Sequence, residues 1–336
     1  MYVLNIRQLF VTTVILGLIG GGAMVVRADQ VPSIAAGEDA VGTQSISLSQ
    51  ESLAQDVKIS VDKEESSCPI SLGLSYALYT DYVFRGVNFS EPAGEGREKL
   101  NHQLTVSLDW DTGKWGTFGF DTWFEWYAGQ KMIDPDRGGQ NLQEVDYTIR
   151  WTYPLEFIAT DLTLGYTFYV FPNLAHTLRQ DRAKGNNNDD RTHEYWFSLE
   201  HNDAWMWKGL FPENTDGVLN PSFLFAHDVG SILGVWMEFG LSHGFEVPGI
   251  EHLTVTPVWT VAAQCDYWKR GFFLVGDTWS LTVEYDLAGA LKLPKWVGSL
   301  TLAGELYYFN AWGNFRGPDT GDEFWGGMTV NWGLGG

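Results

Sequence analysis

The sequence contains few cysteines and few positive charges, and each shortage excludes a class of protein. Only two cysteines occur among 336 residues, Cys68 and Cys265, so the chain is not a disulfide-stapled scaffold. Lys and Arg number 21 against 42 Asp and Glu, which gives a formal net charge of −21. Proteins that bind nucleic acid need basic side chains to replace the counterions of phosphate. We therefore expect no nucleic-acid partner.

Charged residues and long apolar runs are also scarce. Charged residues make up 19% of the chain and aromatic residues 15%, with 16 Trp. After the first 28 residues, no apolar run reaches the length of a membrane-spanning helix. The many aromatic rings must therefore lie in the core of a sheet or against lipid.

The first 28 residues have the features of an export signal. Arg7 supplies a basic start, Leu9 to Val26 is apolar, and Val26-Arg27-Ala28 fits a cleavage site. We predict that residues 1–28 are a signal peptide and that Asp29 starts the mature protein. An uncleaved membrane anchor is the alternative, because the apolar stretch is long for a signal.

Residues 29–67 contain no aromatic residue and are dominated by Ser, Gln, Asp, Glu and Ala. Such a segment cannot bury enough apolar surface to offset its chain entropy. We predict a disordered periplasmic tail over 29–67, followed by a single β domain over 68–336, where every Trp lies.

The β domain is predicted from runs in which apolar and polar residues alternate with a period of two. Within 279–286, for example, Trp, Leu, Val and Tyr alternate with Ser, Thr, Glu and Asp. Many runs have ten or more residues. Globular strands average about five or six residues, whereas a strand crossing a bilayer needs about nine to eleven. About twelve runs occur, near 70–79 (with a continuation to 88 left open), 101–111, 115–127, 142–153, 158–170, 192–202, 218–228, 232–243, 252–264, 272–287, 297–310 and 323–334.

This pattern predicts an all-β fold, an antiparallel transmembrane β-barrel of about 12 strands in the bacterial outer membrane. The count is even, as in single-chain bacterial barrels, and a closed barrel leaves no strand with an open edge. A secreted β-sandwich also alternates, so the barrel prediction depends first on strand length and second on aromatic rings near the strand ends, which are typical of membrane-interface girdles. Six Trp are expected to face outward: Trp110, Trp126, Trp151, Trp259, Trp279 and Trp332.

The links between runs alternate between long and short until residues 203–217, which are long where a short link is expected. The turn near Gly230 is short where a long one is expected. Either one strand is miscounted there, or Trp205-Met206-Trp207 forms a small periplasmic element at the membrane interface.

Three segments of the β domain carry a family resemblance. They are Leu74-Ser75-Tyr76 with Asp81 to Val87, then Leu164 to Tyr169 followed by Phe171-Pro172-Asn173, and finally Glu194 to Leu199. These segments resemble strands of the TorF-type porin family. The resemblance implies an outer-membrane barrel with a channel role.

The candidate site is the face opposite the apolar one, which would line a lumen. Arg150 is its one cation in a strand centre, and Arg85 falls at the rim, where it either pairs with lumen acids at a constriction or forms a structural ion pair. Acidic residues outnumber cationic ones on this face, and an acidic excess favours the passage of cations. Alternatively, the acids hydrogen-bond to Thr, Tyr and Trp and fill a closed barrel. The predicted lining acids are Asp109, Asp121, Glu125, Asp146, Asp161, Glu194, Glu200, Glu238, Glu284, Asp286 and Glu305.

The leading functional prediction is a porin-like channel for passive, cation-leaning diffusion of small solutes. A non-conducting structural or adhesive barrel is the alternative, and a secreted sugar-active sandwich is the third; inward rings of Trp123, Trp196 and Trp236 would suit sugar stacking. The chain is not expected to be an enzyme, because the adjacent Ser242 and His243 would point to opposite faces of a strand.

No motif predicts a cofactor or a bound metal. The expected partners are outer-membrane lipid and small solutes, and the sequence leaves a homo-oligomer open. In the predicted strand order, Cys68 and Cys265 lie at opposite ends of the barrel and cannot form a disulfide.

Overall fold

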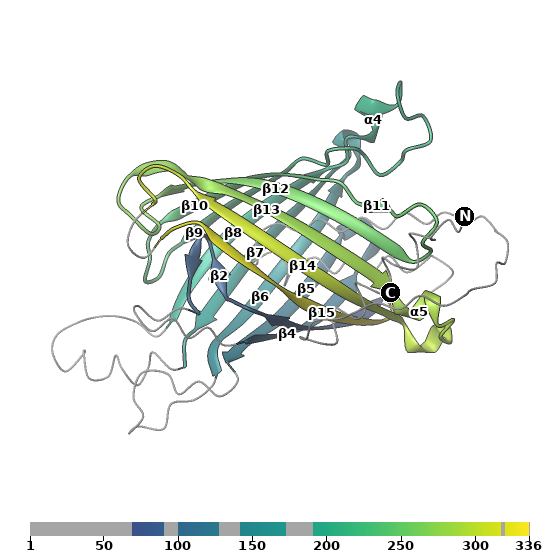
Figure 1. The fold of residues 1–336 in the computed structure, drawn as a ribbon, viewed down its shortest axis with the longest axis horizontal. Coiled ribbons are helices and arrows are strands. Elements are labelled where there is room, and N and C mark those ends of the chain that lie inside the picture. The colour runs from purple at the N-terminus through teal and green to yellow at the C-terminus, as the bar shows by residue number, and fades with distance from the viewer. Residues whose placement is uncertain (1–68, 91–99, 128–141, 173–190, 317–319, 336) are drawn as a thin grey trace, which may run out of the picture.

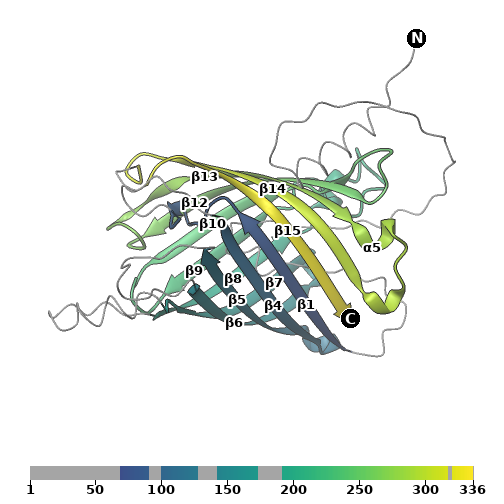
Figure 2. The same ribbon diagram turned by 60° about the horizontal axis from the view of Figure 1, so that its bottom comes forward.

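A computed structural model describes residues 69–90, 100–127, 142–172, 191–316 and 320–335, and these form a closed antiparallel barrel (Figures 1 and 2). Twelve of the thirteen strands in the main sheet make the barrel wall, in chain order. β1 pairs with both β4 and β15, which closes the ring. The wall strands are β1 (Ile70–Tyr79), β4 (Asn101–Asp111), β5 (Thr117–Tyr127), β6 (Leu142–Leu155), β7 (Thr160–Val170), β8 (Arg191–His201), β9 (Ser222–Asp228), β10 (Val235–Ser242), β12 (Leu253–Cys265), β13 (Phe272–Asp286), β14 (Ser299–Ala311) and β15 (Glu323–Gly335).

The predicted fold class is confirmed, and each of the twelve predicted runs overlaps one wall strand. Apart from the barrel sheet, the described strands form only a two-stranded sheet of β2 and β3, so the two large packed sheets of a sandwich, on which the third functional alternative depends, are absent from this part of the chain. None of the helices in the described ranges has the length and apolar character of a membrane-spanning helix. The predicted signal peptide and tail, residues 1–67, lie outside the described residues.

The first strand does not continue to residue 88. β1 ends at Tyr79, and the chain then forms a separate hairpin from β2 (Val83–Phe84) and β3 (Val87–Asn88). Arg85 and Gly86 connect the two short strands with φ angles of +49° and +76°. A two-residue turn with positive φ at both positions fits the right-handed twist of paired strands, so these two residues reverse the chain.

Alternation divides the wall into an outward apolar face and an inward polar face. The six Trp predicted to face outward all lie on the outer face by strand register. Trp110 and Trp279 are 54% and 56% exposed, and Ile149 is 59% exposed. An exposed apolar belt of this extent is unfavourable in water and matches a lipid environment.

The two ends of the barrel differ. At the termini end, β1 begins and β15 ends beside each other, with Ser71 paired to Gly335. The links at this end carry short elements: η1 (Gly113–Trp115), η2 (Glu156–Ile158), α4 (Ala204–Trp207), β11 (Phe245–Glu246), α5 (Leu287–Ala290) and η3 (Lys295–Val297). At the opposite end, called the loop end, residues 80–90, 229–234 and 266–271 belong to the described links.

The long link near residue 203 is an ordered connection between β8 and β9 that contains α4, and no strand was miscounted there. Buried Asp203 accepts hydrogen bonds from the backbone N–H groups of Val218 (2.6 Å) and Leu219 (3.1 Å) and from the indole of Trp207 (2.8 Å). Burial raises the pKa of the Asp203 carboxyl, but these donors outweigh it and lower the pKa overall. The predicted Trp205-Met206-Trp207 element is α4; its place at a membrane interface stays a prediction.

Cys265 is a free thiol at the loop end of β12, the end of the barrel that lies away from Ile70. Cys68 falls outside the described residues, so the absence of a disulfide between the two stays a prediction.

The assignment of faces predicts a difference between two lysine substitutions. Ile149→Lys puts a charge on the lipid face of β6 and should lower the free energy of unfolding by about 2–4 kcal/mol. Ser107→Lys puts the same charge on the inner face, beside Asp121, and should change it by less than about 1 kcal/mol. Urea titration of folding into liposomes measures both. Equal losses would contradict the assignment.

Candidate functional site in the barrel interior

The inner face changes character along the barrel axis. Toward the loop end it carries large buried rings, including Tyr79, Trp123, Trp236, Tyr307 and Trp325. Toward the termini end it carries small side chains and becomes exposed. The Asp109 side chain, near the termini end, is 25% exposed, whereas that of Glu194, near the loop end, is 2% exposed. The small inner residues include Gly73, Ser75, Ser107, Gly119, Thr152, Thr163, Thr254, Ser280 and Thr301.

The twelve predicted lining residues all lie on inward-facing positions, but they form two groups instead of one. Whether they line a conducting pore stays a prediction. Toward the termini end lie Asp109, Asp121, Arg150, Asp161, Glu200, Glu284 and Asp286. Toward the loop end and the middle lie Glu125, Asp146, Glu194, Glu238 and Glu305.

In the first group, Arg150 joins two neighbouring acids. Its Nε donates to the Asp121 carboxylate at 2.8 Å, and its Nη2 lies 2.7 Å from an Asp109 oxygen. β5 separates β4 from β6, so this triad spans three adjacent strands. Arg150 neutralises one of the six acids in this group, and an acidic excess remains.

In the second group, hydrogen bonds occupy the acids. Glu305 accepts from the hydroxyls of Tyr79 (2.6 Å), Tyr307 (2.6 Å) and Thr329 (3.0 Å). The indole of Trp236 donates to Glu238 at 2.7 Å. The alternative of acids bonded to Thr, Tyr and Trp in a filled barrel thus describes the loop-end half. The termini-end half keeps small residues and acids that, except for Asp121, are partly exposed.

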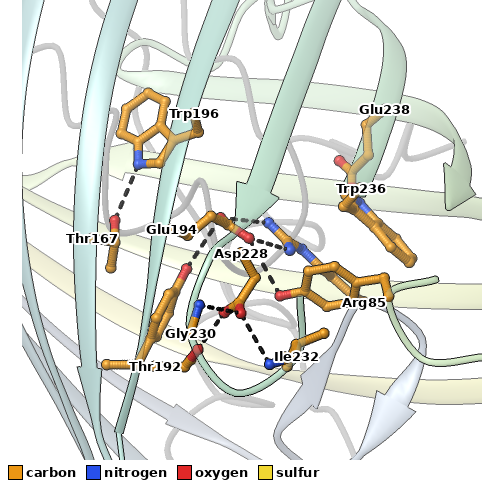
Figure 3. A network of polar contacts seen from close by, with 12 residues as sticks. Arg85, Thr167, Thr192, Glu194, Trp196, Asp228, Gly230, Ile232, Trp236 and Glu238 are labelled. Atoms are coloured by element: carbon orange, nitrogen blue, oxygen red, sulfur yellow. Dashed lines mark hydrogen bonds and ion pairs between the residues drawn. The ribbon is translucent and has the colours of Figure 1, made fainter. Parts of the chain in front are cut away.

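The β2–β3 hairpin folds into the loop-end half and places Arg85 inside the barrel instead of at its rim. The guanidinium forms a bidentate ion pair with Glu194, with distances of 2.7 and 2.9 Å, and both side chains are almost fully buried (Figure 3). The hydroxyls of Tyr267 (3.3 Å) and Tyr169 (3.4 Å) also donate to Glu194. The indole of Trp268 donates to the Arg85 carbonyl at 3.2 Å. Arg85 therefore pairs with a lumen acid, and whether this pair forms a constriction stays a prediction.

A second contact holds the start of the hairpin. The Tyr82 backbone N–H donates to the Ser90 hydroxyl at 2.5 Å, and that hydroxyl lies 3.0 Å from the Tyr127 hydroxyl. The Tyr82 phenol hydrogen-bonds to Glu144. Burial, together with the charges of Glu144, Asp146 and Glu125, raises the pKa of the Tyr82 phenol well above its usual value. Tyr82 therefore links the start of the hairpin to β6.

Several interior residues escaped the sequence prediction. Glu144 lies on β6 two residues before the predicted Asp146 and therefore faces inward like it. The alternation of the strand was enough to predict this position. Asp228 is fully buried and accepts from Thr192 and from the backbone of Gly230, Ile232 and Leu233, which fixes the link between β9 and β10 (Figure 3). The sequence feature that indicates this turn is an Asp two residues before a Gly, because Asp side chains commonly accept a hydrogen bond from the backbone N–H two residues later.

No family model and no curated protein matches the chain. Solved structures with a similar fold include a NanC porin (10% identity, TM-score 0.41, covering 78% of this chain and 98% of that one). A KdgM porin in complex with disordered oligogalacturonate has 9% identity, a TM-score of 0.40 and the same coverage. An outer membrane channel from Pseudomonas putida F1 has 10% identity and a TM-score of 0.43 over 81% of this chain and 98% of that one. At this level of similarity, function has to be inferred from the barrel's own residues.

The hairpin turn predicts a difference between two glycine substitutions. An added Cβ at Gly86 would lie 2.4 Å from the Phe309 ring, whereas at Gly113, whose φ of +67° is similar, nothing lies within 4 Å. Both Gly→Ala changes strain the backbone, but only Gly86→Ala should displace the hairpin. Hydrogen exchange of residues 82–89 should accelerate in Gly86→Ala and stay unchanged in Gly113→Ala. Equal protection in the two variants would contradict the packing described.

Proposed function

We propose that this protein is a porin-like channel of the bacterial outer membrane for passive diffusion of small solutes, with a preference for cations. The observation that carries the proposal is the acidic excess in the termini-end half of the lumen, where five of the six acids are partly exposed and Arg150 is the only Lys or Arg on the inner face of the described strands. An acidic lining within an apolar wall produces a negative potential that attracts cations. The proposal involves no catalytic step and no cofactor.

Orientation and family are part of the proposal. The termini end faces the periplasm and the loop end faces the cell exterior, as in outer-membrane barrels with short periplasmic turns and longer extracellular loops. The outer face, with its exposed Leu, Phe and Trp side chains, supports a position in lipid. Membership in the TorF-type porin family is supported by the residues quoted above.

A second candidate is a non-conducting structural or adhesive barrel. The observation that favours it is the filled loop-end half, where the β2–β3 hairpin and inward rings form one buried cluster. The two candidates differ in whether the hairpin leaves the lumen. In the channel proposal it is a movable closure, and in the alternative it is permanent.

Ion preference gives the first test. Refolded protein in a planar bilayer under a KCl gradient should show a cation-selective reversal potential. The double variant Asp161→Asn/Glu200→Gln removes two acids that are paired across β7 and β8, and should move this potential toward zero. The control, Glu213→Gln/Asp216→Asn, removes two charges from the link between β8 and β9, outside the lumen, and should leave it unchanged. Anion selectivity of the unmodified protein would refute the acidic lining.

Closure gives the second test. Arg85→Ala leaves Glu194 buried without its strongest partner and should loosen the hairpin, raising the open probability or the conductance. The control is Arg316→Ala, which removes the Arg of an exposed ion pair with Asp322 in a loop-end link and should conduct like the unmodified protein. A protein that inserts but conducts in neither form would favour the non-conducting candidate.

A further inference from the structure

The surroundings of the Arg85 guanidinium have the composition of a binding site for an organic cation. Its central carbon lies 4.5 Å from the centroid of the Tyr267 ring, 5.0 Å from that of Phe84 and 5.4 Å from that of Trp236. The Glu194 carboxylate faces its edge with two oxygens. Aromatic faces around a cation with a carboxylate at its edge are how proteins recognise guanidinium and alkylammonium groups.

Glu194, Trp236 and Tyr267, together called the cage, belong to a different part of the fold from Arg85, which occupies it. Glu194 and Trp236 lie on the wall strands β8 and β10 (Figure 3), and Tyr267 lies in the link between the wall strands β12 and β13. Arg85 comes from the hairpin, whose two strands pair only with each other and make no ladder with the wall. The occupant can therefore leave without breaking a strand of the barrel, and the wall side of the cage remains.

An empty cage is chemically unfavourable. Glu194 is 1% exposed, and after Arg85 leaves it retains only the two tyrosine hydroxyls as described partners. A carboxylate that loses its cation at a site lined by aromatic rings is destabilised until water or another cation takes the vacated place, so the site can accept a replacement. A planar fork of N–H donors matches both the two carboxylate oxygens and the flanking rings, which a hydrated inorganic cation does not.

We propose that Glu194, Trp236 and Tyr267 form a binding site for solutes that carry a guanidinium group, and that Arg85 occupies this site as an internal substitute when the lumen is closed. Such a solute competes with Arg85 and thereby favours displacement of the hairpin. This inference rests on the proposed channel and deepens it, because it names a substrate class. The binding step itself does not require conduction.

Calorimetric titration of the refolded protein in detergent micelles tests the site. The probe is ethylguanidinium chloride at constant ionic strength, and its neutral isostere N-ethylurea is the matched control ligand. Arg85→Ala should bind ethylguanidinium saturably. The unmodified protein, in which the cage is filled, and Arg85→Ala/Glu194→Gln should each bind it at least about ten-fold more weakly. N-ethylurea should bind at least about ten-fold more weakly than ethylguanidinium to Arg85→Ala.

If Arg85→Ala does not refold, Arg85→Gly serves instead, because glycine accepts the φ of +49° at this position without strain. Folded Arg85→Ala or Arg85→Gly without saturable binding would overturn the proposal, and so would equal binding of N-ethylurea. Binding by a variant that never conducts would support the site and refute only the channel. Conduction without binding would refute only the site.

Discussion

The constraint on which this structure depends is the need to pair every backbone N–H and C=O group where no water is available. In a bilayer, strands can meet it only by closing on themselves, and here β1 closes the ladder by pairing with β15. The pleat of each strand sends successive side chains to opposite faces of the sheet, and closure makes one of these faces the lipid side and the other the lumen. The distribution of acids and rings inside the barrel follows from that alternation.

Because alternation is a local property, the sequence was sufficient to predict the wall. The run over 272–287 became β13 (Phe272–Asp286), and Trp279 faces outward there while Glu284 faces inward. Strand length distinguished a membrane barrel from a sandwich, since ten of the twelve wall strands have at least ten residues. Parity alone also placed Arg150 on the inner face, because it lies two residues from Thr148 and Thr152 on one strand.

The interior could not be predicted in the same way, because its contacts join residues far apart in the chain. Arg85 and Glu194 are separated by 109 positions, and no periodicity relates a hairpin to the strand it faces. The division of the acids into a group that is mostly partly exposed and a group buried among aromatic rings depends on depth along the axis, which parity does not encode. Asp228 was missed because its partners are backbone N–H groups of a short link, and any acid at a strand end has the same pattern.

The buried Arg85–Glu194 pair is also a poor way to make a permanent plug. Desolvating two charges offsets much of their attraction, and well-packed apolar side chains commonly stabilise a core as well or better. An apolar hairpin tip would stay in place, because leaving would expose apolar surface to the water of the lumen. A charged tip regains hydration when it leaves, so the difference between the inserted and released states is smaller. A pair of this kind therefore favours a closure that can be reversed, and the cation that reverses it most readily is one that satisfies Glu194 in the same geometry.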